Sequence, residues 1–327
     1  MGMYYDPYQT LSRNRLFNFV LGPRGNGKSY GAKKVAIRNF IDKGEQFVYL
    51  RRYETEMPAS QMRNFFDDIK KEFPDIEFSA DRGLFRIDKE IAGWYMPLSK
   101  SQQLKSIPFP NVTLLIFDEF IINTGMIRYL PNEVTTFLDC YSTISRDRDI
   151  PVLFLSNAIS FANPYFIYFN VSLEPGQTKK LTKDISIELI KNQEYSDHVR
   201  NTRFGRLIDG TRYGAYNMDN EFLLDTDTFI VKSLPKNAHY LCTLSIQSNQ
   251  LGIFCDSETG LMYAAETVDP TCRFKYALTL DDHNQQTQLA RTTTVLPLVF
   301  DCFANGNMRF VGQSTKNKLY DVLRRNL

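Results

Sequence analysis

The chain has 327 residues, which is enough for two domains because a single hydrophobic core rarely grows beyond about 250 residues. Its 43% hydrophobic and 23% charged residues are typical of a globular protein, and no apolar run reaches the ~18 residues of a membrane span, so no membrane partner is expected. The net charge of +2 alone does not indicate a nucleic-acid partner. The five cysteines form no C-x-x-C pair and no zinc-like spacing with the three histidines, so we expect free thiols in a reducing compartment.

The first half of the chain alternates short apolar runs with segments of helical character. Strands are predicted at 16–21, 47–50, 85–87, 113–120 and 151–158, and helices at 28–42, 59–72 and 131–145. Strands that alternate with helices are typical of a parallel α/β sheet. The pattern does not predict the order of the strands.

The pattern changes at the turn-rich segment LEPGQT, which ends at residue 178. A mixed stretch over 178–228 is interpreted as a connector. From 229 the chain continues as short β runs with turns, followed by a predicted helix at 285–304 and a basic tail. The expected layout is an α/β domain over 1–177, the connector, and a smaller α+β domain over 229–327.

The segment GPRGNGKS at residues 22–29 lies between the first predicted strand and the first predicted helix. It matches G-x-x-x-x-G-K-[ST], in which glycines let backbone N–H groups face phosphates and the following helix presents its positive end to the same anion. In this pattern Lys28 contacts the β and γ phosphates and the Ser29 hydroxyl binds Mg²⁺. We therefore expect ATP as the bound substrate. The residues expected to contact it are Gly22, Pro23, Arg24, Gly25, Asn26, Gly27, Lys28, Ser29 and Tyr30.

Two acids, Asp118 and Glu119, end the apolar run TLLIFDEF. Asp118 can hold the Mg²⁺ that Ser29 also contacts, and Glu119 can orient or deprotonate a water that attacks the γ phosphate. Adjacent acids in a buried strand are costly without a metal or a hydrogen-bond network, so a metal site is favoured over ordinary surface acids. A glutamate directly after the metal-binding aspartate favours ATP hydrolysis over transfer to a second substrate.

Polar residues also end the next predicted strand, 151–158. Ser156 and Asn157 can sense the γ phosphate and relay its loss. Polar residues are common at strand ends, so this signal is weak by itself.

Three arginines are candidates for stabilising the γ phosphate. Arg24 lies inside the phosphate loop and could act on its own site, whereas Arg146 and Arg148 lie in SRDRD and could act on the site of a neighbouring subunit. Position alone does not separate these roles from solvent-facing charges or from surface ion pairs with the neighbouring aspartates.

Taken together, these residues resemble the DNA-packaging ATPases of small, short-tailed bacteriophages of the phi-29 type. NTRFGRLIDGTRYG (201–214) and YLPNEV (129–134) are far more specific to that family than the phosphate loop is. The resemblance covers nearly the whole chain. It also includes GEQFVYLRRY (44–53), AGW (92–94), FDEF (117–120), LSNA (155–158), NPYF (163–166), GLMY (260–263) and LTLDD (278–282).

The resemblance implies a terminase-like, ASCE-type P-loop NTPase fold for the N-terminal domain and an RNase H-like fold, a vestigial nuclease, for the C-terminal domain. It implies a homo-oligomeric ring, expected to be a pentamer, that uses ATP to drive double-stranded DNA into a procapsid. The ring would act in the host cytoplasm, transiently at the portal vertex, with the portal protein as partner. No RNA-recognition motif is legible, so the binding of a phage structural RNA is left open.

The resemblance also implies roles for individual residues. It assigns Gly22 to Ser29 to Walker A, Asp118 and Glu119 to Walker B with Glu119 as the catalytic carboxylate, Arg146 to a trans arginine finger, and Ser156 and Asn157 to the coupling motif.

Three alternatives remain at this point. An active metal-dependent nuclease needs several converging carboxylates, but the predicted strand pair YLCTLSIQ and LGIFCD offers only Asp256, at the end of the second strand. Nuclease-competent relatives carry a metal-binding Asp on the opening strand, so we expect no cleavage, although Asp281 and Asp282 keep this alternative open. A P-loop small-molecule kinase would not need Glu119 or a trans arginine. A scaffold that binds nucleotide only structurally would not need the complete set of Walker residues.

Overall fold

A computed structural model describes residues 4–104, 107–122, 129–130, 132–157, 163–169, 171, 173, 177–190, 193–211, 229–246, 249–278, 280, 282–289 and 295–325. The chain forms two compact units. The first comprises Met1–Asn123, Thr136–Ser160 and Ser172–Leu224, and the second comprises Thr124–Thr135, Phe161–Val171 and Asp225–Leu327.

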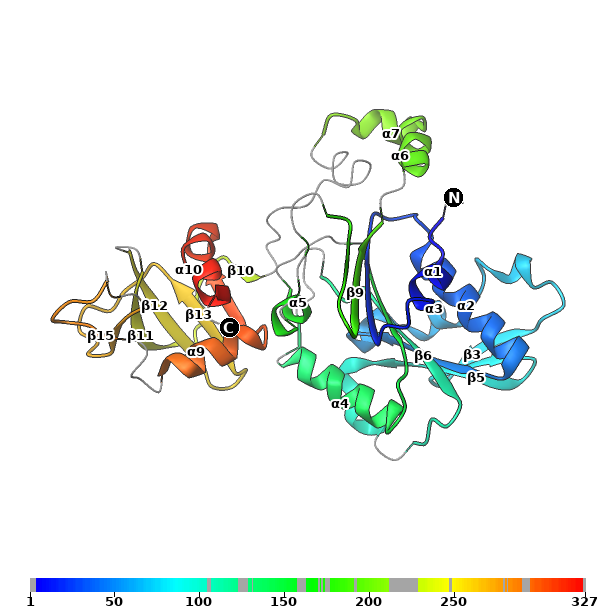
Figure 1. Ribbon diagram of the computed structural model, residues 1–327, viewed down its shortest axis with the longest axis horizontal. Helices are drawn as coiled ribbons and strands as arrows, with labels where there is room; N and C mark the ends of the chain where they lie inside the picture. The colour runs from blue at the N-terminus through cyan, green and yellow to red at the C-terminus, as the bar shows by residue number, and fades with distance from the viewer. Residues whose placement is uncertain are drawn as a thin grey trace. The chain divides into compact units, whose positions relative to one another are not determined.

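The described residues of the first unit form a nine-stranded sheet of order β3-β4-β5-β2-β6-β7-β1-β9-β8 (Figure 1). Its central strands, from β5 to β9, pair in parallel, whereas β3, β4 and β8 add antiparallel edges. The predicted parallel α/β sheet is confirmed. The strands are β1 (Phe17–Leu21), β2 (Gln46–Arg51), β3 (Phe78–Asp81), β4 (Leu84–Ile87), β5 (Glu90–Pro97), β6 (Val112–Asp118), β7 (Val152–Ser156), β8 (Lys179–Leu181) and β9 (Ile185–Leu189).

Two long helices, α2 (Lys28–Lys43) and α4 (Glu133–Ser145), cover opposite faces of this sheet. Val35 of α2 joins the core cluster that contains Val20 of β1. Phe137 of α4 instead contacts the rings of Phe17 and Phe154, at centroid distances of 5.9 and 4.9 Å. Because side chains alternate along a strand, Phe17 and Val20 point to opposite faces, which places the two helices on different sides. The shorter helices of this unit are α1 (Pro7–Leu11), α3 (Ala59–Arg63), α6 (Gln193–Arg200) and α7 (Arg203–Ile208), with 3₁₀ turns at Glu54–Glu56, Lys70–Glu72 and Leu98–Leu104.

The helix predicted over 59–72 is wrong beyond Arg63, where α3 ends. The adjacent Phe65 and Phe66 are both buried, so the chain must turn two consecutive side chains into the core. The Lys33 ammonium of α2 also donates to the Phe65 carbonyl at 2.8 Å, which gives that carbonyl a partner outside a helix. Tertiary packing therefore overrides the local helical preference.

The segment that was expected to be a connector begins inside the first sheet. Strand β9 pairs in parallel with β1, with Ile185 opposite Phe17, and β8 forms the edge beside it. The Glu188 carboxylate accepts hydrogen bonds from Arg13 at 2.6 Å and Thr10 at 2.9 Å, which ties β9 to the chain around α1. Helices α6 and α7 follow, and residues 212–228 lie outside the described part of the chain.

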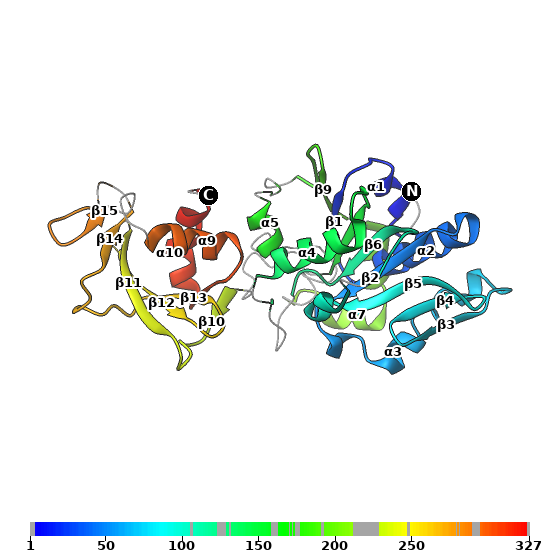
Figure 2. The same cartoon turned by 90° about the horizontal axis from the view of Figure 1, so that it is seen from below.

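The described residues of the second unit form a seven-stranded sheet of order β10-β16-β13-β12-β11-β14-β15, and α9 and α10 lie on one face of it (Figure 2). Strands β11, β12 and β13 pair antiparallel, and β14 pairs in parallel with β11. This mixed α+β arrangement agrees with the RNase H-like fold that the resemblance implies. The elements are α5 (Pro164–Tyr168), β10 (Ile230–Val231), β11 (His239–Ile246), β12 (Asn249–Asp256), β13 (Leu261–Ala265), β14 (Lys275–Ala277), β15 (Gln288–Leu289), α9 (Val295–Ala304), β16 (Met308–Val311) and α10 (Gln313–Arg325).

The helix predicted over 285–304 is wrong in its first part. Gln288 and Leu289 form β15, which pairs with Tyr276 and Ala277 of β14, and α9 begins at Val295. Pairing with a distant strand decides this conformation, and a local pattern does not contain that information.

Two segments that follow β6 and β7 in the chain belong to the second unit. Asn132 and Asn307 exchange two hydrogen bonds, from the Asn132 N–H at 2.9 Å and from the Asn307 amide at 2.5 Å. The Tyr165 hydroxyl donates to the Glu133 carboxylate at 3.0 Å, and Ile167 joins the core cluster of the C-terminal sheet. The second unit is therefore discontinuous in sequence, unlike the continuous C-terminal domain that the sequence predicts.

All five cysteines are free. Within the described ranges, no helix combines the length and the apolar character that crossing a bilayer requires.

Candidate active site

The strand order brings three chain segments to one edge of the first sheet. Strand β7 lies between β1 and β6, and all three run in parallel, so their carboxyl ends lie side by side. The Gly22 N–H donates to the Ser156 carbonyl and the Phe120 N–H to the Leu155 carbonyl, both at 3.2 Å. The glycine-rich loop after β1 and the acids at the end of β6 are thus both attached to the end of β7, where open α/β sheets bind ligands.

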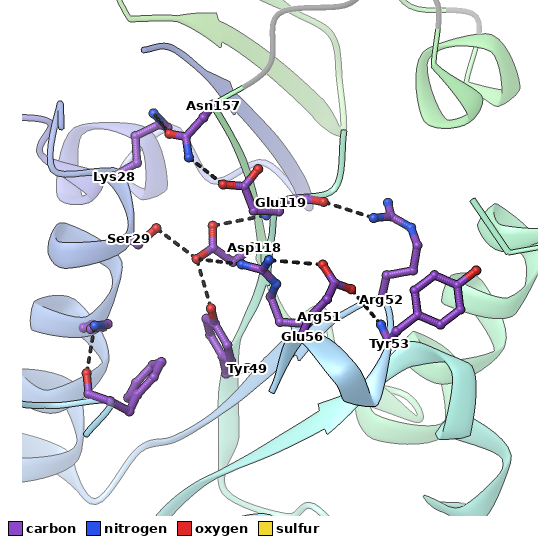
Figure 3. Close-up of polar contacts among 12 residues, drawn as sticks. Lys28, Ser29, Tyr49, Arg51, Arg52, Tyr53, Glu56, Asp118, Glu119 and Asn157 are labelled. Atoms are coloured by element: carbon purple, nitrogen blue, oxygen red, sulfur yellow. Dashed lines mark hydrogen bonds and ion pairs between the residues drawn. The ribbon is translucent and has the colours of Figure 1, made fainter. Parts of the chain in front are cut away.

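Lys28 is buried beneath the glycine-rich loop (Figure 3). Its ammonium donates to the carbonyls of Gly22 and Pro23 at 2.8 Å and to the Asn157 side-chain oxygen at 2.9 Å. Gly27, the N-cap residue before α2, has φ +76°, a backbone conformation that is unfavourable for residues other than glycine. Burial lowers the pKa of Lys28 to about 8, against the opposing attraction of the nearby acids.

Asp118 is held on both carboxylate oxygens. Its Oδ2 accepts hydrogen bonds from the Ser29 hydroxyl at 2.9 Å and the Tyr49 hydroxyl at 3.0 Å, and its Oδ1 accepts the Glu119 N–H at 3.1 Å. Arg51 lies 4.0 Å from the same carboxylate. A serine hydroxyl beside a carboxylate is the hard oxygen donor set that Mg²⁺ prefers, so these residues fit that ion.

Glu119 has a left-handed backbone, with φ +59°. Its carboxylate accepts a hydrogen bond from the Asn157 amide, so Asn157 contacts both Glu119 and Lys28 (Figure 3). Burial and the neighbouring Asp118 raise the pKa of Glu119, while Arg51, Asn157 and Lys28 partly oppose that shift. The glutamate and the lysine are therefore bridged by one amide at the end of β7.

The three candidate arginines differ in their surroundings. Arg24 is exposed and lines the cavity beside the glycine-rich loop. Arg146 is also exposed, follows α4 with φ +55°, and forms no ion pair among the described residues. Arg148 is engaged by main-chain carbonyls, which makes it a clamp on the start of β6. Those carbonyls belong to Phe109, Pro110, Val112, Ile144 and Ser145, at 2.6 to 3.3 Å.

The N-terminal segment forms one wall of a cavity of about 890 Å³ next to Lys28 and Ser29. The Tyr5 N–H donates to the Asn26 carbonyl at 2.8 Å, and Tyr4 lies against Gly27. Sequence motifs did not predict this wall, although MYYDPY places three tyrosines in six residues. Further lining residues from this wall and from α2 are Asp6, Pro7, Tyr8, Tyr30, Lys34 and Arg38.

Gly31→Ala is expected to weaken nucleotide binding. A Cβ on Gly31 would lie 2.8 Å from the Pro7 ring and 2.9 Å from the Tyr5 carbonyl, so the N-terminal wall would have to move. A loss of about 1 kcal/mol of contact lowers affinity about fivefold. The measurement is fluorescent ADP titration. Gly44→Ala is the control because Gly44, the C-cap residue after α2 with φ +68°, does not line the cavity. This variant should lower thermal stability and leave nucleotide affinity unchanged.

The end of β2 also contributes to the site, which sequence motifs did not predict. Tyr49 and Arg51 contact Asp118, and Arg52 contacts the main chain that follows it (Figure 3). Strand β2 is the neighbour of β6 on the side opposite β7. The tandem arginines in FVYLRRY were a usable signal, because charged residues directly after a buried parallel strand lie at the binding edge of the sheet.

The acids of the second unit do not converge among the described residues. The Asp256 carboxylate is occupied by its own turn, where it accepts the N–H groups of Glu258 at 3.0 Å and Thr259 at 3.4 Å. In the described part of the chain, no three His, Cys, Asp or Glu side chains come close enough to hold a metal. Asp281 lies outside the described residues.

Comparison with known proteins decides the family. The model of the podovirus DNA encapsidation protein (Gp16) family matches residues 1–327. The chain belongs to this family. It is 39% identical to the DNA packaging protein of Bacillus phage phi29 over 327 residues, which cover 99% of this chain and 98% of the relative. The DNA packaging protein of Bacillus phage B103 is 39% identical over 319 residues, covering 96% and 98% of the two chains.

Solved structures agree with this assignment. A chain of the bacteriophage phi-29 viral genome packaging motor assembly is 38% identical and matches with a TM-score of 0.60 over 99% of both chains. The N-terminal domain of the DNA packaging ATPase of phage phi29 is 41% identical, with a TM-score of 0.55 over 58% of this chain and 98% of that one. The resemblance to the phi-29 family is therefore confirmed, and the first unit has the fold of a packaging ATPase domain. The protein is a phage DNA-packaging protein, which disfavours a small-molecule kinase.

Proposed function

We propose that this member of the DNA encapsidation family hydrolyses ATP at the end of β1, β7 and β6 and uses that reaction to drive double-stranded DNA into a procapsid. The observation that supports the proposal best is the convergence of Lys28, Ser29, Asp118, Glu119 and Asn157 at the ends of three neighbouring parallel strands. A nucleotide-binding scaffold would not need a partly buried glutamate with a raised pKa at that place.

The polar groups have distinct tasks in this proposal. The loop N–H groups and the Lys28 ammonium bind the β and γ phosphates. Ser29 and Asp118 would hold Mg²⁺, which, when bound, neutralises charge on the phosphates. The Glu119 carboxylate orients the attacking water and accepts its proton, because it lies beside the ammonium that binds the γ phosphate. The other residues proposed to contact ATP are Gly22, Pro23, Arg24, Gly25, Asn26 and Gly27 of the loop and Tyr30 of α2.

Asn157 is placed to report the γ phosphate. Its oxygen accepts from Lys28 and its amide donates to Glu119, so a phosphate that attracts the Lys28 ammonium also changes the partner of Glu119. Ser156 links the same strand end to Gly22 through its carbonyl. This gives β7 a role in relaying loss of the γ phosphate.

The working form proposed is a homo-oligomeric ring, with five copies as the expected number, at the portal vertex in the host cytoplasm. A relative solved within a viral genome packaging motor assembly supports a multi-subunit working form. The proposed partners are the portal protein and double-stranded DNA. The exposed Arg146 is the candidate finger supplied to a neighbouring subunit, and Arg24 is the candidate that acts on its own site. No RNA partner is proposed.

DNA is expected to stimulate ATP hydrolysis, and the stimulation should fade as salt rises. A protein that contacts several DNA phosphates displaces bound counterions, so its affinity for DNA falls steeply as the salt concentration rises. The measurement is steady-state phosphate release with and without double-stranded DNA at two salt concentrations, repeated on procapsids, where the ring assembles. The control is the salt dependence of the basal rate. Absence of hydrolysis by the free protein and on procapsids would contradict the proposal.

A further inference from the structure

Arg52 is a fully buried cation directed at the main chain of the acidic strand end. It is 1% exposed, and its guanidinium donates to the Glu119 carbonyl at 3.2 Å (Figure 3). The guanidinium also donates to the Phe120 carbonyl at 2.6 Å. It also lies over the Phe117 ring, 5.9 Å from the centroid. Burying a guanidinium is unfavourable unless its N–H groups donate to acceptors, as they do here. Donation from two nitrogens of one planar group to two neighbouring carbonyls is a geometry specific to arginine.

The segment that Arg52 holds has an unfavourable backbone. Glu119 adopts φ +59°, a left-handed conformation in which its Cβ is crowded by its own backbone. Such a conformation persists only where the surroundings impose it, and it occurs preferentially at functional sites. The Glu119 N–H is fixed by Asp118 at 3.1 Å, and the following Phe120 N–H by Leu155 at 3.2 Å. Arg52 supplies the partners of the two carbonyls of the same turn.

Arg52 is itself anchored, so it can act as a rigid support. Its carbonyl accepts the Ser99 N–H at 3.0 Å, just beyond the end of β5. It directly follows β2, which pairs with β6 in continuous parallel register from Phe47, opposite Leu114, to Leu50, opposite Phe117. The support of Glu119 therefore comes from the strand next to its own, while the Glu119 carboxylate is held from the other side by Asn157 of β7.

We propose that Arg52 is a positioning residue for ATP hydrolysis: by holding the Glu119 and Phe120 carbonyls, it keeps the Glu119 carboxylate at the Asn157 amide, facing the phosphate loop. This inference rests on the proposed ATPase function. Loss of the fork-shaped contact lets the turn relax toward an ordinary right-handed backbone, which redirects the Glu119 side chain. The phosphate loop, which follows β1 rather than β2 or β6, keeps its nucleotide-binding groups.

The test compares Arg52→Lys with Arg148→Lys in the full-length chain. Arg148 is the matched control because it also clamps main-chain carbonyls, but at the start of β6 and the end of α4. The turnover number, the KM for ATP, the Kd for a fluorescent ADP analogue and the thermal midpoint are measured for both variants, with assays well below both midpoints.

The expected result is a split between turnover and binding. Arg52→Lys should lower kcat at least tenfold and change the nucleotide Kd less than twofold, whereas Arg148→Lys should lower the thermal midpoint with kcat within twofold of wild type. A kcat of Arg52→Lys within twofold of wild type, or equal losses of kcat in both variants, would overturn the proposal.

A second variant keeps the proposal testable if Arg52→Lys does not fold. Arg52→Gln keeps an amide donor without the charge, and it should show the same split between kcat and Kd. If Arg52→Gln folds and keeps wild-type kcat, the proposal is wrong. The wild-type rate, measured alongside, distinguishes failure of the proposed ATPase function from failure of the role of Arg52. An inactive wild type would overturn the ATPase function. An active wild type with fully active Arg52 variants would overturn only the role of Arg52.

Discussion

Glu119→Gln is expected to lower kcat for ATP hydrolysis by roughly 10²- to 10⁴-fold, the range for loss of a general base. The glutamine keeps the size and hydrogen-bonding capacity of the side chain beside Asn157, but it cannot accept the proton of the attacking water. Nucleotide affinity should remain close to wild type, because Lys28 and the loop are unchanged. Single-turnover phosphate release and ADP-analogue titration measure the two quantities separately.

The same variant should be more stable than wild type at neutral pH when Mg²⁺ and nucleotide are absent. The pKa of Glu119 is raised in the folded chain, so between its ordinary value and the raised value the native state binds more protons than the unfolded state. Stability therefore falls as pH rises through that window, and the full penalty is present above the raised pKa. Removing the carboxylate should raise the thermal midpoint above the window and have little effect below it.

Thermal midpoints of both proteins across acidic to neutral pH, in a chelator, check this expectation. A stability difference between the two proteins that does not depend on pH would show that folding does not raise the pKa of Glu119. A Glu119→Gln variant that keeps wild-type kcat would remove Glu119 from the catalytic machinery.

Arg146→Ala is expected to cost about 10³- to 10⁵-fold in kcat if Arg146 is the trans finger, the range for loss of such an arginine. Arg146 is exposed after α4, and in the described chain it has no ion-pair partner that would account for it structurally. A finger that acts across subunits should leave the folding and nucleotide affinity of each subunit intact. The measurement is ATP turnover of assembled rings, with thermal midpoint and ADP-analogue affinity beside it.

Mixing experiments identify the direction of action. Rings made from Arg146→Ala and Lys28→Ala subunits should recover turnover, because some interfaces join an intact Arg146 to an intact Lys28. Rings made from Lys28→Ala and Glu119→Gln subunits are the control, since every ATP site then carries a lesion. Recovery in the control, or none in the first mixture, would contradict a trans role for Arg146 and favour Arg24 as the arginine that contacts the γ phosphate.

Short-range patterns predicted the parts of this protein in which spacing along the chain is enough. The glycines before Lys28 and Ser29 create a phosphate loop wherever a strand precedes them and a helix follows, and both are present. Asp118 and Glu119 at the end of an apolar run were likewise predicted for the edge of the sheet. Helix predictions were wrong where partners distant in sequence overrode the local helical preference, as at Phe65 and Gln288.

Contacts between neighbouring strands could not be predicted, because the strand order is not encoded in any local pattern. Only the placement of β7 between β1 and β6 lets Asn157 bridge Lys28 and Glu119. Only the placement of β2 beside β6 brings Arg52 to the Glu119 carbonyl.

Motif spacing thus predicted the phosphate loop and the acidic pair, and the family resemblance predicted the packaging role. The folded chain was needed to separate the clamp Arg148 from the exposed Arg146, and to find the N-terminal wall of the cavity and the support from Arg52. The physical reason is the same in each case. A motif reports which groups a segment carries, whereas the partner of each group is chosen by long-range pairing and burial.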